Sequence, residues 1–420
     1  MAVSGRSLGR RGRRCLGVSD LASAAQIAGE SRSAGAASLS GVRIYLDHNA
    51  TTPLREEVIQ AMIEMLRDHY GNPSSSHREG AEARRRLDGA REAVAALVGA
   101  GPGQVVFTGS ATEANNAAIR GALRARRPGR VVTTTIEHPS VSEPLEVLAG
   151  AGTEVLCVPV DETGRVEREA LARALREPTD LVVVILANNE TGTIQDLPAI
   201  AQLARPVGAH LHVDATQALG KIPVSLGDLQ ADSLCGSAHK FNGPKGAGFL
   251  AARDGVNLSP FILGGPQERR RRGGTENTAG LVGLGKAADL AGQALPERAR
   301  EMARLRDRLW EGIVEKVPGV RRNGSAEHVL PNTLNVEFQG AAGDVLLEAL
   351  DLEGVAVSAG AACASGSIEP SHVLSALGRS PEEARGALRF STGHGNDTQQ
   401  IDQVLALLPD LVARAREAAG

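Results

Sequence analysis

The chain has 420 residues, of which 42% are hydrophobic and 23% are charged, so it can hold a large core and more than one domain. Its 46 basic and 49 acidic side chains give a net charge of −3, which argues against a nucleic-acid-binding protein. The longest purely apolar run, residues 181–187, is far shorter than the ~20 residues of a membrane helix. We therefore expect a soluble protein with no membrane contact.

The four cysteines are too far apart for a disulfide framework or a zinc site. They are Cys15, Cys157, Cys235 and Cys363. This spacing favours a reducing compartment, and we expect a cytoplasmic protein. Residues 1–41 differ from the rest because arginines are frequent there and no acidic residue occurs before Asp20. Such a start is typical of an organelle transit peptide, of a disordered tail or of an upstream start codon. We favour the tail.

After a short strand near residue 43, strands and helices alternate along the chain. The predicted strands are 104–108, 131–137, 154–160, 181–187, 209–214, 232–237 and 246–252. The predicted helices are 55–69, 79–98, 109–123, 140–148, 167–176 and 197–204. Alternation with near-continuous Val, Ile and Leu strands indicates an α/β fold, with a mostly parallel sheet that is covered on both faces.

The pattern changes after Gly273, and a second, smaller α+β domain is expected from about residue 295. It contains a long helix at 294–317, a strand at 333–338 and a last helix from Gln400. The strand at 43–46 is expected to join it. The predicted organisation is thus an extension at 1–41, a large domain at 56–295, and a small domain formed by 42–55 and 296–420.

Four successive strands are followed by polar side chains, and parallel strands bring their carboxyl ends to one crevice. The residues in question are His138, Asn188, Asn189, Glu190, Asp214, Gln217, Ser237, His239 and Lys240. A lysine at a strand end can form a Schiff base with an aldehyde, and an aspartate on a neighbouring strand can keep a pyridine nitrogen protonated. Lys240 and Asp214 therefore point to an enzyme that uses pyridoxal 5'-phosphate (PLP).

The run Gly109-Ser110-Ala111-Thr112 leads from a strand into a helix through small residues. The free N–H groups and the helix dipole at that point form a phosphate site, although Ser110 or Thr112 would equally serve as an ordinary helix cap. His210, His212 and Asp214 lie at alternate positions of one strand. They could bind a metal there, but satisfied core histidines are the commoner outcome, and we expect no metal site.

Cys363 lies in a stretch of Ala, Ser and Gly, SAGAACASGS, that cannot pack tightly. This indicates a nucleophile on a flexible loop rather than a buried structural cysteine. Arg389 is a candidate clamp for a substrate carboxylate, with a surface arginine as the alternative. The run Arg269 to Arg272 lies between glycines in an acidic chain, which favours a loop that faces a cofactor or a subunit over a nucleic-acid patch.

Ten motifs, taken in order, carry a family resemblance. They are YLDHNATTP, GNPSSSH, TGSATEANN, EHPSV, ANNETG, HVDATQALGK, SAHKFNGPKG, GGTEN, SAGAACASGS and LRFSTG. From about residue 43 to the end, the chain closely resembles the cysteine desulfurases, which are fold-type I PLP enzymes of the aminotransferase class V superfamily. The cysteine loop resembles that of the group with the longer loop, which serves iron–sulfur cluster assembly.

The resemblance implies a role for each matching residue. Lys240 would form the Schiff base and move protons, Asp214 would pair with the pyridine nitrogen, and His138 would stack on the ring. Asn189 and Gln217 would flank the phenolic oxygen of the cofactor. The phosphate would be held by Ala111, Thr112, Ser237 and His239, and by Thr275 from the second subunit of a homodimer. Arg389, with Asn189, would bind the substrate, and Cys363 would accept the sulfur.

The implied reaction converts L-cysteine to L-alanine and leaves a persulfide on Cys363, for iron–sulfur clusters or another sulfur-containing cofactor. The implied partners are a second subunit and an acceptor such as an iron–sulfur scaffold protein. Ala238 stands where glycine is common in this family, and the chain ends soon after its final helix, which leaves the acceptor open. A selenocysteine lyase or an aminotransferase of the same fold remains as an alternative.

Overall fold

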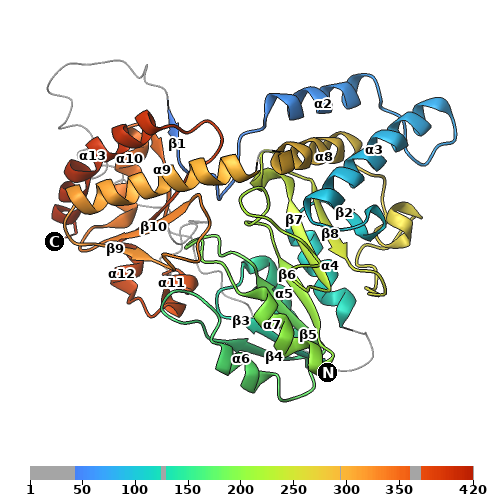
Figure 1. The fold of residues 1–420 in the computed structure, drawn as a ribbon, viewed down its shortest axis with the longest axis horizontal. Helices are drawn as coiled ribbons and strands as arrows, with labels where there is room; N and C mark the ends of the chain where they lie inside the picture. Colours follow the sequence, from blue (N-terminus) through green and yellow to red (C-terminus); the bar gives the residue numbers. More distant parts are fainter. Residues whose placement is uncertain (1–42, 124–128, 294, 360–369, 420) are drawn as a thin grey trace, which may run out of the picture.

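The computed structural model describes residues 43–123, 129–293, 295–359 and 370–419 (Figure 1). The predicted N-terminal extension and Cys363 lie outside the described residues.

A seven-stranded sheet forms the centre of the larger part of the molecule. Its strand order is β2 (Val105–Thr108), β8 (Gly248–Ala252), β7 (Ser233–Ser237), β6 (His210–Asp214), β5 (Leu181–Ile185), β3 (Arg130–Thr134) and β4 (Glu154–Val158). The five strands from β7 to β4 run parallel, whereas β8 is antiparallel to both of its neighbours. The predicted α/β fold with a mostly parallel seven-stranded sheet is confirmed.

Alternate residues of the strands face two layers of helices (Figure 1). Val131, Leu181 and Val183 pack on one face, against α4 (Ala111–Ala122) and α5 (Pro139–Gly150). Val182, Val184 and their equivalents on the other strands pack on the opposite face. That face is covered by α3 (Arg78–Leu97), α6 (Arg168–Ala174), α7 (Leu197–Ala204) and α8 (Thr278–Gln293). Because both faces are covered, apolar residues of the central strands point to both sides of the sheet, and β5 (LVVVI) has no polar residue at all.

The sequence did not predict α8, although it is 16 residues long. Its glycines lower the helix propensity, but they let neighbouring helices approach closely. A Cβ on Gly285 would lie 2.4 Å from Ala90 Cα of α3, and one on Gly283 would lie 2.8 Å from Met62 of α2 (Glu56–Arg67). Tight packing against α2 and α3 therefore overrides local propensity here.

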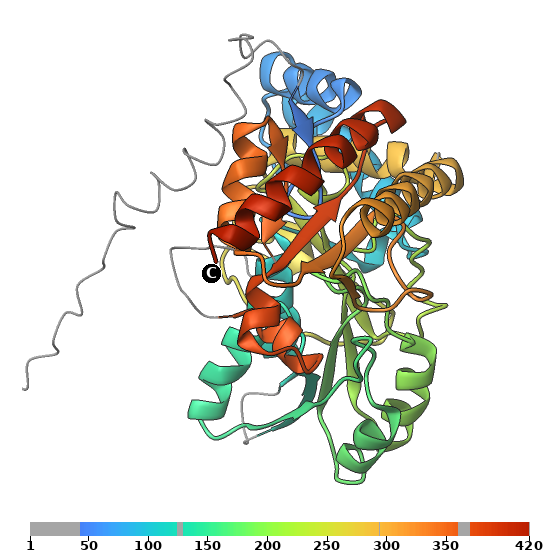
Figure 2. The same ribbon diagram turned by 90° about the vertical axis from the view of Figure 1, so that its left-hand side faces the viewer.

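The smaller part is built on a four-stranded antiparallel sheet (Figure 2). Its strand order is β12 (Ser358–Ala359), β13 (Ala387–Ser391), β10 (Thr333–Phe338) and β9 (Val320–Asn323). Its helices are α9 (Leu295–Lys316), α10 (Gly343–Leu352), α11 (His372–Ala376), α12 (Pro381–Arg385) and α13 (Thr398–Glu417). The predicted strand at 333–338 is confirmed at both ends, and α9 and α13 match the predicted helices within two residues.

Strands β10 and β13 have one apolar face and one polar face. Leu334, Val336 and Leu388 pack into a second core with α9, α10 and α13. On the opposite face, the side chains of Asn335 and Arg389 donate to backbone oxygens that follow β5 in the larger part. The period-two pattern of the strands thus turns polar groups toward the space between the two parts.

Residues 44–55, which we call the strap, connect the two cores. Strand β1 (Ile44–Tyr45) pairs in parallel with β11 (Val355–Ala356), and Ile44 and Leu46 belong to the second core. Leu54, ten residues on, packs against the first core.

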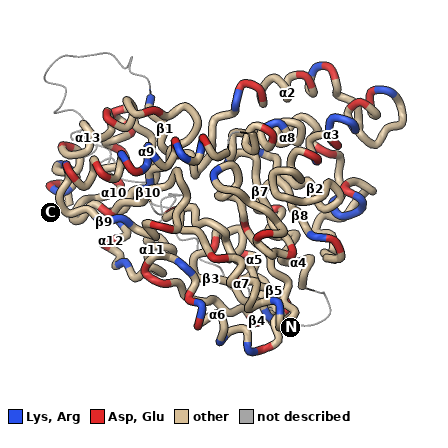
Figure 3. Tube along the Cα trace, in the orientation of Figure 1, with Lys and Arg blue, Asp and Glu red and all other residues tan. Residues whose placement is uncertain are grey.

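Acidic and basic residues are interspersed over both parts of the molecule (Figure 3). Within the described residues, no helix has the length and apolar character that a membrane span requires.

Candidate active site

The neighbouring parallel strands β3, β5, β6 and β7 end at one edge of the large sheet. His138 follows β3, Asn189 follows β5, Asp214 ends β6, and Lys240 lies in the short 3-10 helix Ala238–Lys240 directly after β7. The sequence predicted this grouping, because the carboxyl ends of parallel strands meet at one crevice.

Asp214 is buried, and its carboxylate is held by groups of the larger part of the molecule. Its Oδ2 accepts from Asn115 Nδ2 at 2.8 Å, and its Oδ1 accepts from the Thr216 backbone N at 3.0 Å. Two donors on separate elements fix both oxygens of the carboxylate.

The Lys240 amine reaches the strap. Its Nζ donates to the carbonyl oxygens of Asn49 at 2.7 Å and Ala50 at 2.8 Å. Burial, followed by the charge of Arg389, lowers the pKa of Lys240 to about 8. A substantial share of this amine is therefore neutral near physiological pH, which is the form that attacks an aldehyde.

His138 caps the N-terminus of α5. Its Nδ1 accepts from the Ser140 backbone N at 3.0 Å and lies 2.9 Å from Ser140 Oγ. Burial is the main cause that lowers the pKa of His138, and the charges of both Asp214 and Lys240 also act on it. The ring is therefore neutral and carries its proton on Nε2.

The start of α4 offers a phosphate site. Ser110 takes the cap position, where its Oγ accepts from Glu113 N at 3.1 Å. The N–H groups of Ala111 and Thr112 lie in the first turn, where a helix provides no backbone acceptor. Ser237 contacts Ala247 O at 3.4 Å and the His239 ring contacts Thr51 at 3.3 Å. Because burial lowers the pKa of His239 to about 4, this ring is neutral and would act as a hydrogen-bond partner.

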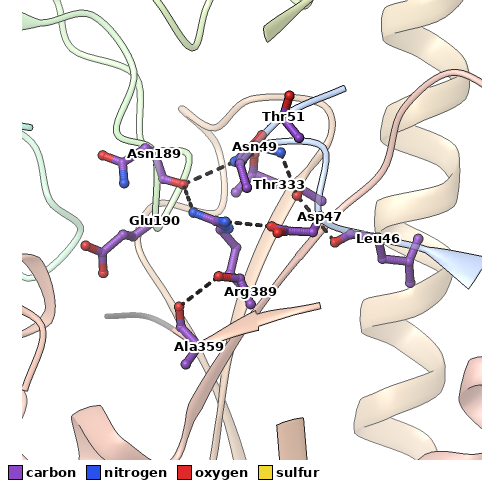
Figure 4. A network of polar contacts seen from close by, with 12 residues as sticks. Leu46, Asp47, Asn49, Thr51, Asn189, Glu190, Thr333, Ala359 and Arg389 are labelled. Carbon is purple, nitrogen blue, oxygen red and sulfur yellow. Dashed lines mark hydrogen bonds and ion pairs between the residues drawn. The ribbon is translucent and has the colours of Figure 1, made fainter. Parts of the chain in front are cut away.

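Arg389 lies at the opposite side of the site, between the strap and the end of β5 (Figure 4). Its Nη2 donates to Asp47 Oδ1 at 2.7 Å and its Nη1 donates to Asn189 O at 2.9 Å. Among the described residues, the buried Nε has no hydrogen-bond partner. Asn49 bridges this region, since its Nδ2 donates to Thr333 Oγ1 at 2.9 Å and to Asn189 O at 3.2 Å. The Nε–H of the guanidinium is thus a candidate donor for an anionic ligand.

Gln217 contacts the strap, whereas Thr275 lies on the surface of this chain. The Gln217 amide donates to Asn49 O at 2.9 Å and accepts from Lys221 Nζ at 2.9 Å, so it faces the strap. Thr275 is exposed on this chain, in the loop before α8. Its predicted contact with the cofactor of a second subunit stays a prediction.

The segment with Cys363 lies outside the described residues, but the chain that follows it is anchored. Ser371 donates to Glu190 Oε2 at 2.6 Å, and the His372 ring lies 3.0 Å from Glu137 O. Both acceptors belong to loops at the carboxyl edge of the large sheet. Ser371 and His372 are therefore attached beside the site.

The contacts of two further groups, the histidines of β6 and the arginine run 269–272, bear on hypotheses from the sequence. The rings of His210 and His212 both contact Ser233 Oγ, at 2.7 and 2.9 Å, which favours satisfied core histidines over a metal site. In the arginine run, Arg271 donates to Val105 O at 3.0 Å and Arg272 pairs with Glu113 at 2.9 Å. These two arginines thus hold the loop against β2 and the start of α4.

Sequence reasoning gave no role to several residues that hold the site together. Asp47 and Asn49 lie in the YLDHNATTP motif, and Asn115 and Ser140 support Asp214 and His138. Of these residues, Asn115 had a signal in the sequence. It follows Ala111 by four positions, which places it on the buried face of the same helix. No local pattern indicates that the strap crosses to Lys240.

A fixed carboxylate and a half-buried amine at the carboxyl edge of the large sheet define a site for an aldehyde cofactor. Residues 44–404 match the aminotransferase class-V family. A cysteine desulfurase IscS of Methanosarcina thermophila is 41% identical over 375 residues, which cover 89% of this chain and 93% of that protein.

Solved structures agree. A NifS-like protein superimposes with a TM-score of 0.83 at 37% identity, covering 89% of this chain and all of the other. SspA in complex with cysteine gives a TM-score of 0.75 at 34% identity, covering 84% and 99%. The chain therefore belongs to the cysteine desulfurases of the aminotransferase class V family.

This family is PLP-dependent, and the residues present fit that cofactor. A neutral amine is available for the aldehyde, and the carboxylate of Asp214 is held for a pyridinium. The first turn of α4 suits a phosphate.

Proposed function

We propose that the protein is a PLP-dependent cysteine desulfurase that converts L-cysteine to L-alanine and carries the sulfur as a persulfide on Cys363. The observation that supports it most is the Lys240 amine, with a pKa lowered to about 8, directly after the strand that lies next to the one ending in Asp214. In this proposal, the sulfur goes to an iron–sulfur scaffold or another sulfur acceptor.

Different residues would hold the cofactor and the substrate. Lys240, Asp214 and His138 would hold the cofactor, with its phosphate on Ala111, Thr112, Ser237 and His239. Asn189 and Gln217 would contact its phenolic side, and Thr275 would act from the second subunit of a homodimer. Arg389 would bind the substrate carboxylate through its unpaired Nε and a second N–H.

Bound PLP supplies an electron sink for the pair that is left when the substrate loses its Cα proton. The Lys240 amine, in its neutral form, takes that proton and returns it. The His138 ring presents its Nε2–H, because the Ser140 backbone N–H occupies Nδ1. It can therefore donate to a group that gains negative charge.

Sulfur transfer balances without an outside oxidant. The Cys363 thiolate bonds to the substrate sulfur while the Cβ–S bond breaks, and the electron pair of that bond stays on Cβ, which takes a proton. Cysteine plus one thiol thus gives alanine plus one persulfide. A thiol reductant, or the acceptor, then removes the outer sulfur and restores the thiol.

The test is to incubate the purified protein with PLP, L-cysteine and dithiothreitol, and to measure alanine and sulfide. We expect equal amounts of both, and a mass increase of one sulfur atom on the Cys363 peptide when the reductant is omitted. Cys363→Ser should lose sulfide release, whereas Cys157→Ser, which alters an exposed cysteine on β4, should retain it. Transamination that persists in Cys363→Ser, with no alanine from cysteine in either protein, would contradict the proposal.

A further inference from the structure

Asp214 accepts the last hydrogen bond of a buried chain that crosses two strands and a helix. Asn115 Nδ2 lies 2.8 Å from Asp214 Oδ2, and Asn115 Oδ1 lies 2.9 Å from His212 Nε2. On its other side, His212 Nδ1 lies 2.9 Å from Ser233 Oγ, which lies 2.7 Å from His210 Nε2. Asn115, His212 and Ser233 are fully buried, so water does not compete for these bonds.

The orientation of the Asn115 amide follows from its partners. A carboxylate only accepts, so Asn115 must turn its NH₂ group toward Asp214. The second hydrogen of that group goes to Ser140 Oγ at 2.9 Å. Its Oδ1 then faces His212 and the Cys235 thiol, whose Sγ lies at 3.0 Å. Both donors and both acceptor positions of the amide are therefore occupied, and the amide cannot rotate without breaking four contacts.

The amide in turn fixes the protons of the chain. Because Asn115 Oδ1 only accepts, His212 carries a hydrogen on Nε2. Burial lowers the pKa of His212 to about 3, so the ring is neutral and its Nδ1 accepts. The Ser233 hydroxyl must donate to that nitrogen, and its oxygen is left to accept from His210 Nε2–H. Every hydrogen in the chain therefore points toward Asp214.

We propose that Asn115 is the positioning residue of Asp214, held in its donating orientation by the chain His212–Ser233–His210. The inference rests on the proposed function, because Asp214 has a pyridinium to pair with only if the protein binds PLP. In this role Asn115 touches no cofactor atom. It keeps the carboxylate aimed at the ring nitrogen.

The first test compares two neighbouring asparagines of α4. Within the described part of the chain, Asn116 Nδ2 bonds to Thr112 O of its own helix alone, so Asn116→Ala is a matched control for Asn115→Ala. Titration of the cofactor-free proteins with PLP should show affinity weakened roughly tenfold or more in Asn115→Ala, since the lost bond reaches a charged group. Asn116→Ala should stay within about twofold of the wild type.

A second variant separates positioning from mere stability. Asn115→Asp keeps the shape but places a carboxylate oxygen beside Asp214 and His212. Two close carboxylates cannot both ionise freely, so PLP should bind more weakly than to Asn115→Ala. The same carboxylate should make His212 protonate within the accessible pH range, and nitrogen NMR of histidine-labelled protein reports that change. A purely structural role would lower the melting temperature of both variants without changing PLP affinity or the His212 titration.

The wild-type protein provides the decisive measurement even if a variant does not fold. The nitrogen shifts of His212, assigned by loss of signals in His212→Gln, should show a proton on Nε2 and none on Nδ1. A proton on Nδ1, or equal PLP affinity in Asn115→Ala and Asn116→Ala, would overturn the inference. If the wild type itself neither binds PLP nor forms alanine, the proposed function fails instead, and the His212 proton still decides the direction of the chain.

Discussion

The Asp214 side and the Arg389 side of the site use hydrogen bonds in different ways. Around Asp214, the partners come from α4 and the large sheet, and all of them belong to the larger part of the molecule. Around Arg389, the partners come from the strap and from the loop after β5, so the contacts join the two parts. One side is completed by folding, whereas the other contains an Nε with no partner among the described residues and a contact of Arg389 with the Asn189 carbonyl that a ligand would replace. A cofactor suits the first side, and a substrate that enters and leaves suits the second.

The largest effect should come from Lys240, whose amine reaches across to the strap from the Asp214 side. Lys240→Ala should lower alanine formation by at least roughly a hundredfold, because the proton-transfer group is lost. The absorbance of the lysine-bound cofactor should also disappear. Lys245→Ala, a nearby exposed lysine, is the control and should keep both. Comparable activity in the two variants would refute the assignment of Lys240.

The second-largest effect should come from Arg389, and it should change substrate binding without changing cofactor binding. Arg389→Gln should raise KM for L-cysteine roughly tenfold to a hundredfold, the value of a charge-assisted pair, and leave PLP affinity unchanged. Steady-state kinetics and PLP titration measure the two quantities. Arg385→Gln, which breaks an exposed pair with Glu382, should change neither. A loss of PLP affinity in Arg389→Gln would show that the two sides do not act separately.

Asp47 tests the electrostatic link between the sides. The Arg389 charge lowers the pKa of Lys240 and the Asp47 charge raises it. Asp47→Asn should therefore move this pKa further below about 8, and the pH at which PLP reacts with the cofactor-free protein should fall by roughly one unit. The rate of the absorbance change, measured against pH, gives the shift. Asp402→Asn, which alters an exposed pair with Arg308, should leave the curve in place.

Glu137 tests how a buried acid on the Asp214 side affects the pH dependence of stability. Burial raises the pKa of Glu137 to about 8 from an ordinary value of 4.5, so the folded state keeps a proton that the unfolded state loses. Its contribution is therefore fully present below pH 4.5 and is lost as pH rises toward 8. Glu137→Gln should remove a slope of at most about 1.4 kcal/mol per pH unit from the free energy of unfolding. Denaturant unfolding at several pH values measures it, with the exposed Glu143→Gln as control.

The smallest effect should come from the loop that supports the start of α4. Glu268, Arg269 and Arg270 all have positive φ, at 47°, 57° and 65°, which favours glycine. Arg270→Gly should therefore raise the free energy of unfolding by about 0.5–1 kcal/mol relative to Arg270→Ala, which removes the same exposed side chain without relieving the backbone. Thermal unfolding of the pair measures it. Equal stability would mean that the loop pays no conformational cost.

The sequence predicted the Asp214 side better than the Arg389 side. A strand that ends in Asp214 and another followed by Lys240 are local patterns, and parallel strands bring them together by a general rule. The partners of Arg389 are far away in the chain, since Asp47 is 342 residues from it. No period or propensity connects such positions. Likewise, α8 was missed because its glycines serve contacts with α2 and α3 that only the folded chain contains.

The strap has a practical consequence for anyone who shortens or tags this protein. A cut before Arg43 leaves every described contact in place. A cut only seven residues further on would remove the second-core side chains Ile44 and Leu46, the counter-ion of Arg389, and the carbonyl of Asn49 that receives both Lys240 and Gln217. Removal of the chain before Arg43 by a protease should therefore leave the enzyme active. Removal of the next seven residues should inactivate it.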